Sequence, residues 1–166
     1  ASAVSLTDAL RAPETFAIEL IDGLALRIAG RSKLLDTGLL SPGQRRILGQ
    51  PGAHLLVHET SDTSQQPLRQ GQEPLSEKEA ERFWKFRKGM LWQMGRFNRR
   101  FPALSVINDL AVPRERLGDL IHGIREIARD EALPLPFYAH AGDATFHFRP
   151  LFRADAPDVQ ERVSGV

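Results

Sequence analysis

Residues 135–152 read LPFYAHAGDATFHFRPLF, two short apolar runs on either side of a Gly-Asp turn. This pattern predicts a β-hairpin. With Asp143 and Ala144 at the centre of the turn, His140 faces His147, and directly opposed residues have Cβ atoms about 5 Å apart. Because side chains alternate along a strand, phenylalanine and alanine form one face. The other face carries Tyr138, His140, His147 and Arg149.

Outside the hairpin, strand-like runs alternate with helix-like segments. Strands are expected at residues 15–21, 53–60 and 103–112, and helices at residues 24–29, 77–96 and 113–133, the last with Pro113 at its first position. The 77–96 helix begins with Ser76-Glu77-Lys78-Glu79, a capping-box pattern. Residues 61–75, rich in Ser, Gln, Asp and Pro, are expected to form a mobile loop. This order predicts an α+β fold, an antiparallel sheet with helices packed on one face, and ferredoxin-like units of the split βαβ kind are expected.

The composition is that of an ordinary globular domain and excludes several functions. The 166 residues, 42% of them hydrophobic, form one domain or at most two small ones. With 22 Lys+Arg against 21 Asp+Glu, no strong field attracts nucleic acid or anionic membrane. No apolar run reaches the ~20 residues of a spanning helix, and the first residues lack a signal-peptide pattern, so a cytoplasmic location is expected. The absence of cysteine excludes disulfides, thiolate metal sites and cysteine nucleophiles.

One charged residue interrupts the apolar stripe of the 77–96 helix. On a wheel of about 100° per residue, Arg87 lies at the centre of the stripe. The apolar positions around it are Ala80, Phe83, Trp84, Met90, Leu91 and Met94. A buried guanidinium needs a carboxylate partner or an anionic ligand. An internal ion pair, a solvent-facing end of the helix and a ligand site therefore all remain open.

The paired histidines indicate a possible metal site. Two neutral imidazoles at hairpin separation can share a divalent metal, and a nearby arginine can receive a carboxylate held against it. Such a pair is half a site, because a catalytic zinc takes three protein ligands, and Asp143 and Asp109 are the local candidates for the third. The alternative is a polar sheet face whose histidines only hydrogen-bond.

Four segments carry a resemblance to a known family. Residues 140–147 (HAGDATFH) resemble H-x-G-D-G-N-x-H, and residues 83–88 (FWKFRK) resemble W-x-x-R-K/E. Residues 108–117 (NDLAVPRERL) resemble E-D-x-A-V-P-x-x-R-L, and residues 17–26 resemble A-x-E-L-x-D-x-x-A-L. These are patterns of the C-terminal domain of FAD-linked oxidases, the group that includes glycolate oxidase and the D-lactate and D-2-hydroxyglutarate dehydrogenases. Residues 147–151 (HFRPL) are similar to the ending of members joined to iron–sulfur modules.

The resemblance implies a substrate-binding cap domain of duplicated ferredoxin-like design over the flavin of a separate FAD-binding domain or subunit. It implies that His140 and His147 are catalytic and hold a divalent metal such as zinc or manganese. Arg87 is implied to bind the carboxylate of a small 2-hydroxy acid. The remaining assignments are Arg149 and Tyr138 as substrate-binding residues and Gly142 and Asp143 as cofactor-binding residues. An iron–sulfur module is a further expected partner, and partners are a route to peripheral attachment at the inner membrane.

Departures from the family pattern define the alternative. Ala144 and Thr145 replace the second Gly and the Asn of the motif, and Ile107 stands where some relatives carry Lys. The family's third metal ligand belongs to a Glu-His-Gly segment beyond a helix expected near residues 155–163. That segment and the FAD-binding domain are expected outside this chain, which is then inactive in isolation. The alternative is a non-catalytic ferredoxin-like assembly or interaction domain that partners a flavoprotein; a stand-alone metallohydrolase is a distant third.

Overall fold

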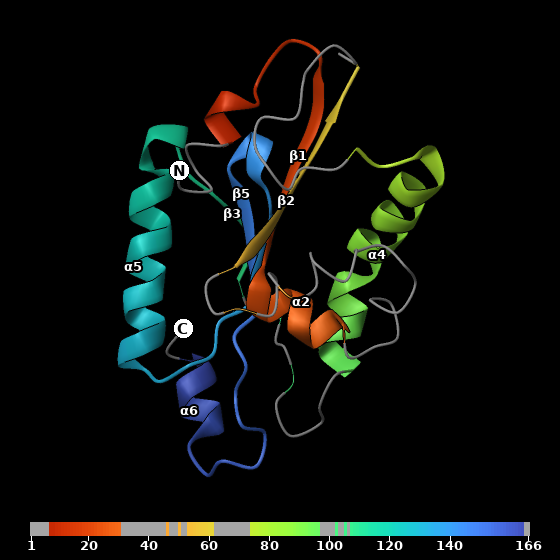
Figure 1. Ribbon diagram of the computed structural model, residues 1–166. Coiled ribbons are helices and arrows are strands. Elements are labelled where there is room, and N and C mark those ends of the chain that lie inside the picture. The colour runs from red at the N-terminus through yellow and green to blue at the C-terminus, as the bar shows by residue number, and fades with distance from the viewer. Residues whose placement is uncertain are drawn as a thin grey trace.

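The computed structural model describes residues 7–30, 46, 50, 53–61, 74–96, 102, 105 and 107–164. The elements in chain order are β1 (Thr15–Asp22), α2 (Gly23–Gly30), β2 (His54–Thr60), α4 (Glu77–Arg96), β3 (Ile107–Ala111), the 3₁₀ turn η2 (Arg114–Arg116), α5 (Leu117–Asp130), β4 (Phe137–His140), the 3₁₀ turn η3 (Ala141–Asp143), β5 (Thr145–Phe148) and α6 (Val159–Ser164) (Figure 1). The predicted order of strands and helices is confirmed. Most of the predicted mobile loop lies outside the described residues.

The five strands form one sheet in the order β2-β1-β4-β5-β3, and every neighbouring pair is antiparallel. Both β3 and β4 are antiparallel to β5, which lies between them, so β3 and β4 run in the same direction. Since α5 joins them, β3-α5-β4 is a split βαβ unit. The predicted α+β class with an antiparallel sheet is confirmed.

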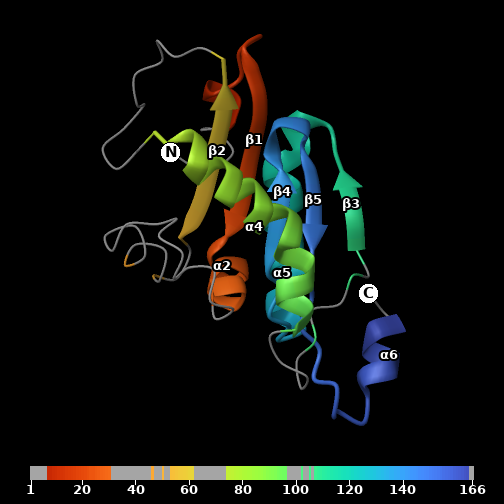
Figure 2. The same ribbon diagram turned by 90° about the vertical axis from the view of Figure 1, so that its right-hand side faces the viewer.

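The expectation that the helices share one face of the sheet is corrected by the structure. Figure 2 shows α4 in front of the sheet and α5 behind it. The chain crosses the sheet from β2 to β3 through α4, and then returns from β3 to β4 through α5. These three strands are parallel to one another, and crossovers of one hand that travel in opposite directions must lie on opposite faces.

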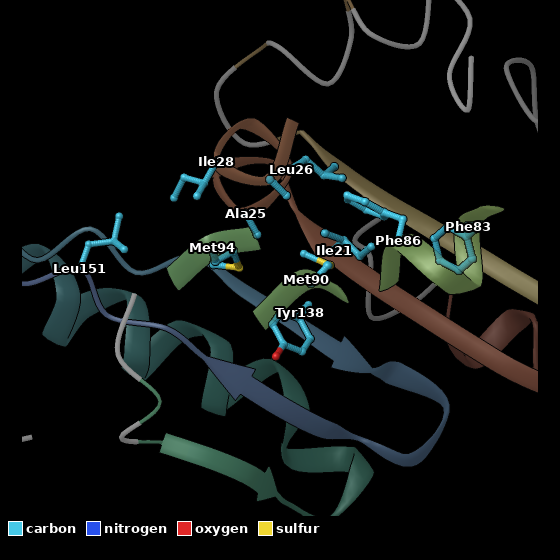
Figure 3. Close-up of a cluster of buried hydrophobic side chains, with 11 residues drawn as sticks. Ile21, Ala25, Leu26, Ile28, Phe83, Phe86, Met90, Met94, Tyr138 and Leu151 are labelled. Carbon is cyan, nitrogen blue, oxygen red and sulfur yellow. The ribbon is translucent and has the colours of Figure 1, made fainter. Parts of the chain in front are cut away.

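Each face of the sheet therefore has its own apolar core. Behind the sheet, the buried face of α5 packs on a cluster that includes Phe137, Phe146 and Phe148. In front, α2 and α4 pack on Ile21 and Tyr138, as Figure 3 shows. The residues that Figure 3 labels are Ile21, Ala25, Leu26, Ile28, Phe83, Phe86, Met90, Met94, Tyr138 and Leu151.

One half of the capping box at the start of α4 is observed, the contact from the Ser76 backbone to the Glu79 side chain. The backbone N–H of Ser76 donates to the Glu79 carboxylate over 2.8 Å, and the Ser76 hydroxyl donates to the same oxygen over 2.5 Å. These hydrogen bonds hold the pKa of Glu79 below its usual value. The helix thus begins where the sequence predicts.

The hairpin forms, but its register differs from the predicted one. His140 is paired with Thr145, and His147 is paired with Tyr138. The turn is longer than predicted because η3 occupies its first part and Ala144 closes it with a left-handed backbone (φ 53°, ψ 35°). This shift of two residues preserves the two predicted faces, since the side-chain period of a strand is two.

Among the described residues, the structure has no helix that is long and apolar enough to cross a membrane.

Candidate functional site

Polar and charged side chains gather on the α4 side of the sheet. Glu19 lies on β1 directly opposite His140 of β4, and His147 follows on β5. Arg87 reaches this face from the middle of α4. Tyr138 and Arg149, on and just after the hairpin strands, complete the group. The hairpin therefore brings together Tyr138, His140, His147 and Arg149, the residues predicted to share one of its faces.

A buried ion pair neutralises Arg87. Its Nε donates to Oε2 of Glu19 over 2.5 Å, and Arg87 and Glu19 are only 7% and 2% exposed. Of the three readings of Arg87 left open by the sequence, the internal ion pair is the observed one. Sequence reasoning did not select Glu19, although its signal is a lone carboxylate inside the apolar run AIELI.

The same carboxylate holds His140. Nδ1 of His140 lies 2.6 Å from the second oxygen of Glu19, Oε1. A carboxylate that accepts from a guanidinium has no proton to give, so Nδ1 is the donor. In the neutral ring, Nε2 then carries the lone pair. The His140 side chain is 46% exposed, which leaves this imidazole open to solvent.

The Arg87 guanidinium keeps an unfilled donor. Its Cζ lies 4.4 Å from the centre of the Tyr138 ring, a cation–π contact. Its Nη2 is buried and has no hydrogen-bond partner in the described part of the chain. A buried donor left unpaired costs about 1–3 kcal/mol. Such an atom is a donor that a further acceptor would satisfy.

Tyr138 and Arg149 form the floor of the site. Nη2 of Arg149 donates to the Tyr138 hydroxyl over 2.9 Å, and Nη1 donates to the carbonyl oxygen of Phe148 over 3.0 Å. Both residues are buried. In Figure 3 the Tyr138 hydroxyl points away from the apolar cluster that surrounds its ring. These contacts fix Arg149 in place beneath the site.

His147 lies beside His140 and is neutral near pH 7. The two ring centres are 5.4 Å apart, with the ring planes nearly perpendicular. Burial and the charges of Arg87 and Arg149 lower the pKa of His147 to about 4. Its side chain is 12% exposed. A neutral imidazole accepts a proton or binds a metal without first losing a proton.

The two local candidates for a third metal ligand do not complete a metal site. Asp109 has a left-handed backbone (φ 52°) in an irregular part of the β3–β5 pairing, and its Oδ1 lies 3.5 Å from Nδ1 of His147. Asp143 is exposed in η3. Within the ranges that the structure describes, no three His, Asp or Glu side chains are grouped so as to hold a metal ion.

Gly142 and Asp143 lie apart from this group. They line a hollow together with residues of the 11–18 segment, including Ile18, whose side chain belongs to the α5-side core. The carbonyl oxygen of Gly142 accepts from Nη2 of Arg114 over 3.0 Å. Their predicted role at a cofactor stays a prediction.

Fold and site together define an α+β domain with a split βαβ unit and a charged cluster on one face of its sheet. The family model of FAD linked oxidases, C-terminal domain, matches residues 2–165, so the chain belongs to this family. No curated protein sequence matches the chain. Membership makes this a domain of an FAD-linked oxidoreductase, and it implies FAD as cofactor and an FAD-binding domain as partner.

Proposed function

We propose that this domain binds a small 2-hydroxy acid for oxidation by FAD. The observation that carries the proposal is Arg87, a buried guanidinium with an unfilled Nη2 donor beside two imidazoles. A carboxylate ligand gives this buried Nη2 donor a charge-assisted acceptor.

The imidazoles supply the second half of the chemistry. A 2-hydroxy acid carries its hydroxyl on the carbon next to the carboxylate, and in the proposed pose, with the carboxylate at Arg87, the hydroxyl is directed toward the histidines. His140, held through Nδ1 by Glu19, offers Nε2 as the acceptor of the hydroxyl proton. The chemistry that FAD would supply is acceptance of the hydride from the same carbon. His147 lies close by as a hydrogen-bond acceptor, and its pKa of about 4 makes it a weak proton acceptor.

A divalent metal such as zinc or manganese is part of the proposal. With a metal present, Nε2 of His140 would be one ligand in place of its role as proton acceptor, and His147 would be the other, with remaining positions taken by solvent, substrate or residues outside the described part of the chain. Its chemistry there would be polarisation of the substrate oxygens. The two imidazoles fit this role because His147 is neutral and His140 leaves Nε2 free of its carboxylate partner.

Flavin reduction in the FAD-containing holoenzyme tests the substrate class. Glycolate, D-lactate and D-2-hydroxyglutarate are mixed anaerobically with wild type and with Arg87→Lys, and bleaching of the flavin is followed. Loss of the planar, forked donor lowers kcat/KM by about 10- to 100-fold in the variant. Arg116→Lys is the matched control, since Arg116 is exposed and pairs with Asp119 across one helical turn. The proposal fails if no 2-hydroxy acid reduces the wild-type flavin, and the non-catalytic alternative then gains support.

Metal binding is tested separately with Mn²⁺ or Zn²⁺ alone. Isothermal titration of the metal-free holoenzyme is expected to show one site in wild type and none in His140→Ala. Binding that survives in both His140→Ala and His147→Ala places any metal elsewhere. His122→Ala is the control, because His122 is an exposed histidine of α5.

A further inference from the structure

We propose that Glu19 is the positioning residue of this site, the single carboxylate that sets both the tautomer of His140 and the orientation of Arg87. The inference rests on the proposed function, since it gives Arg87 and His140 their contacts with substrate. Glu19 itself is 2% exposed and lies beneath them. It acts through its two neighbours and does not touch the reacting atoms.

The fold holds the Glu19 backbone rigidly. β1 is an inner strand, with β2 on one side and β4 on the other. Glu19 is paired with Val57 of β2 and with His140 of β4. Its neighbours Ile18 and Leu20 point to the opposite core and anchor the strand there. The carboxylate is therefore presented from a fixed backbone position.

Each carboxylate oxygen of Glu19 accepts a hydrogen bond from a different residue. Oε2 accepts from Nε of Arg87 at 2.5 Å, and Oε1 accepts from Nδ1 of His140 at 2.6 Å. The first contact places the guanidinium over the Tyr138 ring and uses Nε, so that Nη2 has no hydrogen-bond partner among the described residues. The second keeps the proton of His140 on Nδ1, so that Nε2 stays an acceptor.

Only a carboxylate satisfies both donors, and glutamine tests this without changing the shape. An amide has one acceptor oxygen and one donor nitrogen. If the Gln oxygen accepts from Arg87, its NH₂ group donates to Nδ1 of His140, and the histidine proton moves to Nε2. If the oxygen accepts from His140 instead, the NH₂ group opposes the N–H of Arg87. Either arrangement disables one of the two proposed substrate contacts.

His147 shows what a weakly held imidazole looks like in the same site. Its carboxylate neighbour is Asp109, at 3.5 Å from Nδ1, and the Asp109 side chain is exposed. That distance is too long for a strong hydrogen bond. The buried, short contact of Glu19 therefore singles out His140 as the imidazole with an enforced tautomer.

The test compares wild type, Glu19→Gln and Glu126→Gln in ¹⁵N-histidine-labelled holoenzyme. Glu126 makes the same change on the exposed face of α5, on the other side of the sheet. Long-range ¹H–¹⁵N spectra report which ring nitrogen of His140 carries the proton. Steady-state kinetics with the 2-hydroxy acid that reduces the flavin report kcat and KM.

The expected result is an Nδ1-protonated His140 in wild type and in Glu126→Gln. Glu19→Gln is expected to move the proton to Nε2, or to keep it and raise KM through a displaced Arg87. In both cases kcat/KM falls about 10- to 100-fold while FAD stays bound. Restoration of the wild-type tautomer by Glu19→Asp, which keeps a carboxylate on a shorter arm, supports the role further.

An Nε2-protonated His140 in wild type overturns the inference, and this measurement needs no variant to fold. An unchanged tautomer together with kcat/KM within twofold of wild type in Glu19→Gln overturns it as well. If the tautomer switches but no 2-hydroxy acid reduces the wild-type flavin, the positioning of His140 is supported and the proposed function is overturned. The two failures are thus distinguishable.

Discussion

Replacing Arg87 with methionine tests whether the Glu19–Arg87 pair is a buried ion pair in solution. Methionine keeps the length and the apolar contacts of the side chain but leaves the Glu19 carboxylate, 2% exposed, with His140 as its remaining partner. Removing one member of a buried pair costs about 3–5 kcal/mol. Removal of the unfilled Nη2 donor returns about 1–3 kcal/mol of this. From the middle of both ranges, we expect Arg87→Met to lower the free energy of unfolding by about 2 kcal/mol.

The double variant Glu19→Leu/Arg87→Met makes the prediction sharp. It removes both charges, and an apolar replacement of a buried pair is close to neutral for stability. We expect it to unfold within about 1 kcal/mol of wild type, so that the two substitutions couple by about 2 kcal/mol or more. Urea unfolding followed by circular dichroism measures the free energy of unfolding of wild type, Glu19→Leu, Arg87→Met and the double variant. The same cycle on the exposed pair Arg116–Asp119 should give less than about 1 kcal/mol. Losses that simply add in the double variant would refute the buried pair.

Three further predictions concern the fold and the acidity of the site. Gly23→Ala should lower the free energy of unfolding, because a Cβ there would lie 2.2 Å from the carbonyl oxygen of Ala53. Gly123→Ala in α5 meets open space and should raise the free energy of unfolding by about 0.5–1 kcal/mol. Urea unfolding of both variants distinguishes the two effects. Phe146→Ala, which empties a fully buried position of the α5-side core, should cost about 3–5 kcal/mol in the same assay, and a loss under 1 kcal/mol would contradict that packing. In metal-free protein, NMR titration should place the pKa of His147 near 4. The unfolded chain binds this proton near pH 6.5, so the free energy of unfolding should be unaffected by His147 above pH 6.5 and should decrease as the pH falls toward 4.

Local patterns in the sequence predicted the elements of this fold. The capping box marked the start of α4, and the three- and four-residue spacing of Leu117, Leu120, Ile121 and Ile124 marked α5. The alternation along residues 137–149 separated the phenylalanine face from the histidine face. These signals are local because a helix or strand repeats over a few residues, and each repeat is visible in the chain itself.

The hairpin register depends on the backbone of the turn, and the placement of the helices depends on the path of the chain across the sheet. The sequence indicated a turn at Gly142-Asp143, but the left-handed backbone of Ala144 and the 3₁₀ turn before it set the pairing of His140 with Thr145. α4 and α5 cover opposite faces because the chain crosses the sheet in opposite directions. Neither feature is written in the periodicity of a single segment.

The sequence by itself determined that Arg87, if buried, must find a carboxylate or an anion, because a guanidinium at the centre of an apolar stripe cannot lose its charge; it left open a helix end that faces solvent. Only the tertiary structure decided that the partner is Glu19, 68 residues away, and that the same carboxylate holds His140, 121 residues away. The pairing of β1 with β4 and the packing of α4 across them create that contact. The sequence gives the charge of each residue, but the distance between two charges is set only when the sheet and α4 pack together.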